Sequence, residues 1–144
     1  MTAIERVKGL YGGYLDKALQ LEKDRKIGEG LLGIGKKPAD DPCHEKFADD
    51  MAAALKEIAE GKPDSAVASE ILHYIYSIPA EHEEPKSVYW MLIAVHGCTK
   101  ELIPLLSPSD AEALRKEYGK MFRRWQRLPV QQEIFKALGN AAKR

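Results

Sequence analysis

The stretch that decides the fold is Glu101–Met121, which reads ELIPLLSPSDAEALRKEYGKM. An apolar segment ends at Leu106, and a short polar turn follows around Pro108. Proline favours the first helical position because its missing N–H would be unsatisfied there anyway. Apolar residues then recur three or four positions apart, at Ala111, Leu114, Tyr118 and Met121. The stretch therefore predicts two helices joined by a short turn, with Ser107 as the N-cap of the second.

The same arrangement recurs along the chain at nearly equal intervals. Five prolines lie 21 to 23 residues apart, and each stands where an apolar-periodic segment begins: Pro42, Pro63, Pro85, Pro108 and Pro129. The segments predict helices over about residues 3–26, 42–60, 64–78, 85–106, 108–127 and 129–141. Period-two alternation and hairpin turn pairs are missing from the sequence. The fold class is therefore all-α, with about six helices in antiparallel hairpins.

Length and composition indicate one folded domain. The chain has 144 residues, 44% of them hydrophobic and 31% charged, which is typical of a globular domain of this size. We expect a single helical domain over 1–144. It would consist of an N-terminal helix at 1–27, a glycine-rich loop at 28–41 and regularly spaced helices at 42–144.

Residues 101–121 resemble the HEAT repeat pattern, with an apolar helix end, a short Pro/Asp turn and a helix that carries an early arginine. Residues 54–72 resemble the pattern more loosely. Two proline intervals make a helix pair of 43 to 45 residues, within the range of about 40–47 residues for HEAT and armadillo repeats. The resemblance spans residues 42–128 and implies helix pairs that stack and bind partners along an extended surface. A compact bundle of the same hairpins is the alternative.

Composition argues against several classes of partner. Lys plus Arg and Asp plus Glu both number 22, so the net charge gives no bulk attraction to nucleic acid or to an anionic membrane. The longest apolar run, Val88–Val95, is much shorter than the roughly 20 residues of a membrane-spanning helix. Two cysteines are too few for a disulfide framework. We therefore expect a cytoplasmic protein that does not enter membranes.

Charge is balanced overall but not along the chain. Residues 114–144 hold nine basic residues against two acids, whereas residues 39–84 hold twelve acids against three lysines. A row of cations on one helix face can neutralise phosphates and release counterions. On a helix over 108–127, Lys116, Lys120, Arg123 and Arg127 share one face. The candidate interaction surface consists of these four residues and Arg124.

A second group of residues suggests metal or thiol chemistry. Cys43 and His44 open one predicted helix, and His96 and Cys98 lie on another. Zinc takes four such ligands in a tetrahedron. The adjacent Cys-His and His-x-Cys spacings are not the usual chelating pairs, however, and the side chains would have to meet across two helices. We expect no catalytic residue, no bound metal and no cofactor.

The most favoured function is a small protein–protein interaction module or adaptor, including inhibitor- or immunity-type binding, rather than an enzyme. Its partner would be another protein. The first alternative is nucleic-acid binding through the basic C-terminal helices, and the second is an enzyme that depends on a metal or on the Cys/His residues. A homodimer is a further alternative, because the apolar stretch Leu31–Ile34 and one stripe of the first helix are available for contacts.

Overall fold

The computed structural model describes residues 1–32, 42–83, 86–123 and 128–144. These residues form six α-helices and two 3₁₀ helices, and no strand occurs among them. The elements are α1 (Ala3–Leu32), α2 (Pro42–Glu60), α3 (Ser65–Glu81), α4 (Lys86–Ala94), η2 (Val95–Glu101), η3 (Ile103–Leu105), α5 (Pro108–Met121) and α6 (Pro129–Ala142). The predicted all-α fold class is confirmed.

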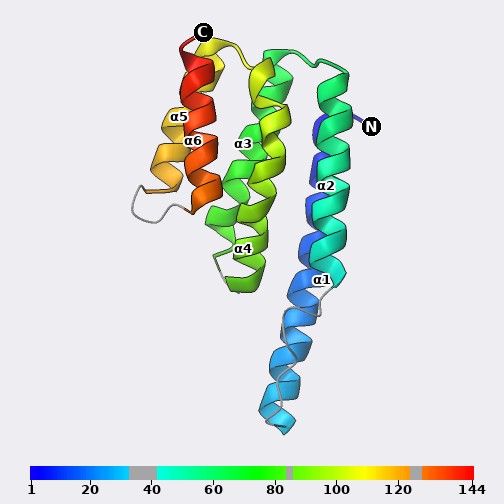
Figure 1. Ribbon diagram of the computed structural model, residues 1–144. Coiled ribbons are helices and arrows are strands. Elements are labelled where there is room, and N and C mark those ends of the chain that lie inside the picture. The colour runs from blue at the N-terminus through cyan, green and yellow to red at the C-terminus, as the bar shows by residue number, and fades with distance from the viewer. Residues whose placement is uncertain (33–41, 84–85, 124–127) are drawn as a thin grey trace.

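The helices form three antiparallel hairpins that lie side by side in two layers (Figure 1). Helices α1, α3 and α5 make one layer, and α2, the continuous α4–η2 segment and α6 make the other. Within each layer neighbouring helices are in contact, so that α3 packs between α1 and α5 and η2 packs between α2 and α6. The middle hairpin is therefore covered on both sides, whereas each outer hairpin keeps one free side.

The core is built from the apolar stripes that the sequence shows. On α1 the buried positions recur at helical spacing, at Val7, Tyr11, Tyr14 and Ala18. On α2, α3 and α6 the buried stripes include Met51, Leu55, Ile71, Ile75, Ile134 and Leu138. Leu21 and Val67 continue the apolar stripes of α1 and α3, but both are exposed, at 46% and 38%.

Helix starts follow the prolines closely. Pro42, Pro108 and Pro129 are each the first residue of a helix, as expected. Ser107 caps α5, since its side-chain oxygen accepts a hydrogen bond from the backbone N–H of Asp110 at 3.2 Å. Pro63 differs, because α3 begins at Ser65 after the extended residue Asp64.

Three predicted boundaries are wrong. Helix α1 continues to Leu32, so residues 28–32 belong to a helix and not to the expected loop. Glycine lowers helix propensity by about 1 kcal/mol but does not forbid helical backbone, and one good helix former, Glu29, separates Gly28 from Gly30. The rest of the expected loop, 33–41, lies outside the described residues.

The other two corrections concern the helices expected over 85–106 and 108–127. After Ala94 the α-helix tightens into η2, where the Thr99 hydroxyl donates to the backbone carbonyl of His96 at 2.6 Å and competes with the regular helix bond. Helix α5 ends at Met121 because the extended residue Phe122 turns its ring into the core, against His96 and Tyr118.

We predict that Ser107→Ala lowers the free energy of unfolding by about 1 kcal/mol, because the N–H of Asp110 loses its capping acceptor. Ser109→Ala is the matched control, since Ser109 is an exposed residue inside the first turn and not the cap. Its effect should stay within about 0.5 kcal/mol. Urea unfolding of both variants measures the difference, and equal losses would contradict the assignment of the cap.

Candidate functional site

A groove runs between α1 and α2 at the free end of the stack. Its volume is about 870 Å³, it is open to solvent, and the described residues that line it come from these two helices. Helix α1 contributes residues from Gly9 to Leu21, including Leu10 and Gly13, and α2 contributes Lys46, Phe47 and Asp50. At about 1.5 Å per helical residue, the lining on α1 extends over about 18 Å.

Glycines open the α1 side of this groove. A Cβ added at Gly9, Gly12 or Gly13 would meet no atom of the described residues within 4 Å, so none of the described elements requires the absence of a side chain. Gly9 and Gly13 line the groove, and Gly12 does not. Each glycine inside a helix costs about 1 kcal/mol relative to alanine. The glycines therefore weaken α1 and give no packing benefit within the described chain.

The floor of the groove is aromatic and well held. The rings of Tyr14 and Phe47 stack with centroids 4.0 Å apart, and Tyr11 meets Phe47 edge-on at 5.1 Å. The Tyr14 hydroxyl is hydrogen-bonded to Nδ1 of His44 at 2.7 Å. These contacts hold the rings of the floor in place.

Two of the charged side chains at the rim, both on α2, pair with each other. Lys46 donates to the carboxylate of Asp50 at 2.7 Å, one turn along α2. Further along the hairpin, Arg6 on α1 forms an ion pair with Glu57 on α2. These contacts place the charges at the edges and leave an apolar floor between them.

The opposite end of the stack is closed. Arg115 on α5 makes two hydrogen bonds to Glu112, at 2.8 and 2.7 Å, and its guanidinium lies 5.6 Å from the centre of the Phe135 ring on α6. A Cβ at Gly139 would lie 3.6 Å from the Arg115 side chain. The arginine thus covers the space between α5 and α6 that stays open between α1 and α2.

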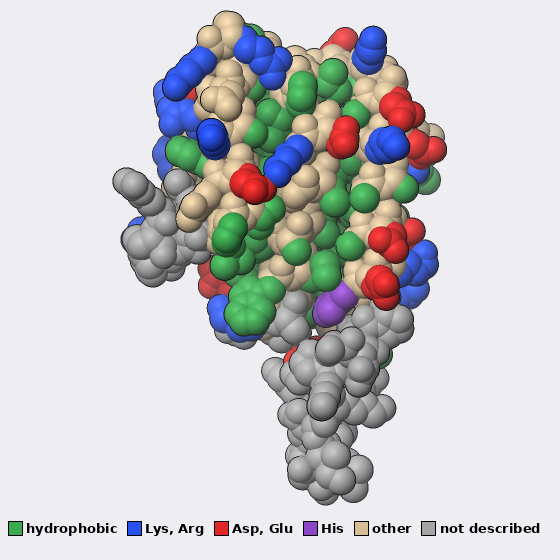
Figure 2. Space-filling view, in the orientation of Figure 1, with side chains coloured by type: hydrophobic (Ala, Val, Ile, Leu, Met, Phe, Trp, Pro, Cys, Tyr) green, Lys and Arg blue, Asp and Glu red, His purple; other side chains and the backbone are tan. Residues whose placement is uncertain are grey.

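The predicted basic surface is only partly a helix face. Lys116 and Lys120 are exposed on α5, but Arg123 lies beyond the end of the helix at Met121. The predicted row along one helix face is therefore wrong after Lys120. Arg124 and Arg127 lie outside the described residues. Figure 2 shows several Lys and Arg side chains over the α5–α6 side of the molecule, whereas on the α2 side Asp and Glu side chains are mixed with Lys and Arg.

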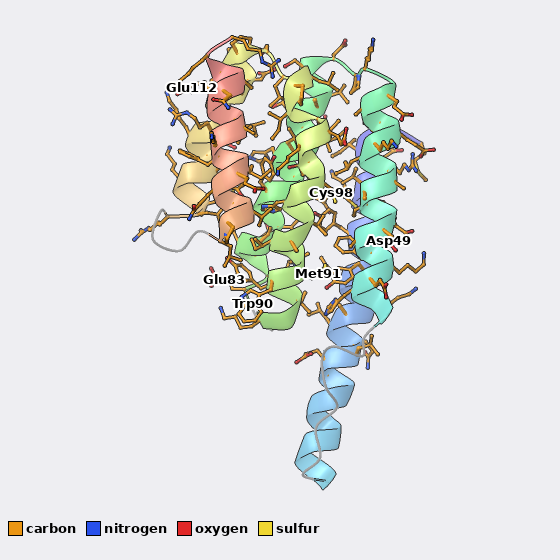
Figure 3. All side chains as sticks on the ribbon, viewed as in Figure 1. Asp49, Glu83, Trp90, Met91, Cys98 and Glu112 are labelled. Atoms are coloured by element: carbon orange, nitrogen blue, oxygen red, sulfur yellow. The ribbon has the colours of Figure 1, made fainter. Side chains whose placement is uncertain are left out.

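The histidines of the metal hypothesis lie in separate clusters. His44 is bonded to Tyr14, whereas His96 is fully buried on η2 and bonded through Nδ1 to the Tyr118 hydroxyl at 3.1 Å. Cys98 is half-buried on η2 (Figure 3), and burial raises the pKa of its thiol. The side chain of Cys43 lies outside the described part of the chain. No group of three or more His, Cys, Asp or Glu residues among the described ones could hold a metal ion.

The groove was missed by sequence reasoning. Its signal was present in the sequence, as three glycines within an amphipathic segment whose apolar stripe continues through them. Sequence alone gave no way to decide whether a neighbouring helix fills the space above them. The structure shows that this space is open.

We predict that the buried His96 makes stability depend on pH. Burial lowers its pKa from about 6.5 to about 3, so the folded protein keeps the ring neutral while the unfolded chain binds a proton below about pH 6.5. Stability is therefore complete above this pH and falls as the pH decreases toward 3. Between pH 7 and 5 the loss from this residue is about 2 kcal/mol.

Urea unfolding of the wild type and of His96→Gln across this pH range measures the slope. The variant should be less stable at pH 7 but should lose about 2 kcal/mol less between pH 7 and 5. Identical slopes for the two proteins would contradict a buried neutral histidine.

Comparison with known proteins gives no relative for this chain. No family model, no curated protein and no solved structure matches it. Within the described residues, none of the helices is both long enough and apolar enough to cross a membrane. The case for function therefore depends on the groove and on the charged surfaces.

Proposed function

We propose that this chain is a protein–protein interaction module that holds an α-helical segment of its partner in the groove between α1 and α2. The observation that carries the proposal is that Gly9 and Gly13 keep the groove open above an aromatic floor. A module of this kind needs no catalytic residue and no cofactor. Its two cysteines are consistent with the reducing environment of the cytoplasm.

Glycine at these positions leaves room for a partner, and it makes α1 less stable in the free protein. Alanine would fit at Gly9 and Gly13 without touching any neighbour and would make α1 more stable. Stability given up without a packing reason is typical of residues that serve binding. Without side chains here, the backbone of a partner helix can approach α1 closely, and large apolar side chains of the partner can enter the groove.

The shape of the groove favours a helix as its occupant. Its lining extends along α1 over about 18 Å, which corresponds to about three helical turns. An amphipathic helix buries its apolar stripe in such a groove through residues spaced three and four apart. The hairpins of the chain already pack helix against helix along the stack, so a partner helix would continue the same contacts at the free end. HEAT-like stacking, which the sequence resembles, provides the same kind of end surface.

We predict that Gly13→Leu fills the groove and abolishes partner binding while it stabilises the fold. The free energy of unfolding should rise by about 1 kcal/mol, because a good helix former replaces glycine in open space. Gly12→Leu is the matched control: it makes the same change on the adjacent residue, which does not line the groove. The control should gain similar stability and keep the partner.

Affinity purification from the source cells, with and without nuclease, compares the wild type with both variants by mass spectrometry. The proposal expects at least one stoichiometric protein that survives nuclease, is retained by Gly12→Leu and is lost with Gly13→Leu. A partner that both variants retain equally would place the binding surface elsewhere and overturn the proposal.

Nucleic-acid binding is the second candidate, and one observation favours it. Lys116, Lys120 and Arg123 are exposed, and none of them forms an ion pair with a described residue. Acidic residues lie among the cations, however, since Glu117 pairs with His73 and Glu133 pairs with Lys100. The early end of α5 also shortens the row that could follow a phosphate backbone.

For this candidate we predict salt-dependent retention on heparin that is lost in the triple variant Lys116→Glu, Lys120→Glu, Arg123→Glu. Three neutralised phosphates would give a slope of log affinity against log salt of about −2 to −3. Circular dichroism of the variant checks that the fold is kept. Equal retention of wild type and variant would exclude these residues as the nucleic-acid surface.

A further inference from the structure

We propose that the helix held in the groove is a basic amphipathic one, whose Lys and Arg side chains lie along α2. This inference depends on the proposed function, because it names the class of partner for the same groove. The class of partner follows from three properties of the groove: the pairing of the charges around it, the positions of the carboxylates that remain, and the size of the open space.

The charges on α2 are not balanced once the ion pairs are taken into account. The helix carries five acidic residues and two lysines. Lys46 is paired with Asp50, and Arg6 of α1 is paired with Glu57. The acids that remain are Glu45, Asp49 and Glu60. All three are exposed and form no ion pair with a described residue, and Lys56 is the only lysine of α2 left to offset them.

Two of the remaining carboxylates flank the groove. Asp49 is adjacent in sequence to the lining residue Asp50 and lies on the edge of α2 that faces away from α4 (Figure 3). Glu45 is one turn away from it and adjacent to the lining residue Lys46, whereas Glu60 lies beyond the groove at the other end of the helix. A partner helix in the groove would pass these two carboxylates at one of its ends. Cations at that end of the partner would then lie near them.

The described lining residues of α1 carry no net charge, because Asp16 and Lys17 offset each other. The partner helix should therefore be asymmetric, with apolar residues three and four apart, Lys or Arg on the flank that faces α2, and no charge requirement on the flank that faces α1. Charges at the rim contribute to selectivity and to the association rate more than to affinity. Most of the binding energy should come from apolar side chains above Tyr14 and Phe47.

The open space at Gly9 and Gly13 specifies the size of the apolar residues. A side chain as large as leucine or phenylalanine on the partner can fill the gap that two missing side chains leave. We expect such residues at the centre of the partner helix, with smaller ones where it crosses Leu10.

A display library of 18-residue peptides with a helical apolar pattern and randomised flanking positions is the probe. It is selected on the immobilised wild type and read by sequencing. Each enriched peptide is then measured by fluorescence anisotropy against Gly13→Leu and its control Gly12→Leu. A second pair of variants tests charge: the double variant Glu45→Lys, Asp49→Lys on α2, and the control Glu70→Lys, Glu81→Lys, which reverses the charge of two exposed residues of α3.

We expect the enriched peptides to bind Gly12→Leu but not Gly13→Leu. They should also carry Lys and Arg on one flank. Their affinity should fall at least tenfold in the α2 reversal, less than twofold in the α3 reversal, and with rising salt. Enriched peptides that need the groove but are neutral or acidic would overturn the basic partner and leave the proposed function in place.

Two other outcomes would overturn the proposed function or the identity of the partner. If no enriched peptide distinguishes Gly13→Leu from Gly12→Leu, the groove does not bind helices and the proposed function fails with it. Sedimentation of the wild type over a range of concentrations tests a second copy of the chain as the occupant. Self-association that Gly13→Leu abolishes and Gly12→Leu preserves would identify that occupant and overturn the separate basic partner.

Discussion

The middle hairpin must bury both of its sides, and the rest of the structure depends on this requirement. Helix α3 packs between α1 and α5, and η2 packs between α2 and α6. The segment from Val88 to Val95 is accordingly apolar on nearly every side. Polar groups that enter this region need partners, because an unpaired buried polar group costs about 1–3 kcal/mol. The Tyr76 hydroxyl on α3 is hydrogen-bonded to the Thr99 hydroxyl on η2 at 2.8 Å, and His96 on η2 is hydrogen-bonded to the Tyr118 hydroxyl on α5. Both bonds link one layer of helices to the other.

The two outer hairpins face a different requirement, and they meet it in opposite ways. A stack that ends needs a polar outer side to stay soluble. The α5–α6 hairpin has one, because Arg115 lies over Phe135 and is held by Glu112. The α1–α2 hairpin instead has glycines at the equivalent place and an aromatic floor beneath them. A side chain therefore covers the outer side of the α5–α6 hairpin, whereas no described side chain covers the glycines of the α1–α2 hairpin.

The sequence predicted the fold where local signals decide it and failed where distant contacts decide it. The start of α5 follows from Ser107 and Pro108 alone, and the stripes on α1 and α2 follow from spacing. The end of α5 could not be predicted, because it depends on Phe122 packing against His96 from another hairpin. The groove could not be predicted for the same reason: the sequence shows the glycines, but only the packing of α1 on α2 shows what lies above them.

We favour the groove over the basic surface as the binding site because apolar burial would contribute more binding free energy than exposed charges. Exposed cations such as Lys116 and Lys120 are solvated, and a single surface ion pair contributes about 0–1 kcal/mol. Apolar burial contributes about 25 cal/mol for each Å², so a helix would gain about 2.5 kcal/mol for each ~100 Å² of apolar surface that it covered, before the losses of association. Charge then acts where it is most effective, as a selector among helices that already fit. In the proposed complex, the apolar floor would hold the partner, and the carboxylates of Glu45 and Asp49 would select for a basic one.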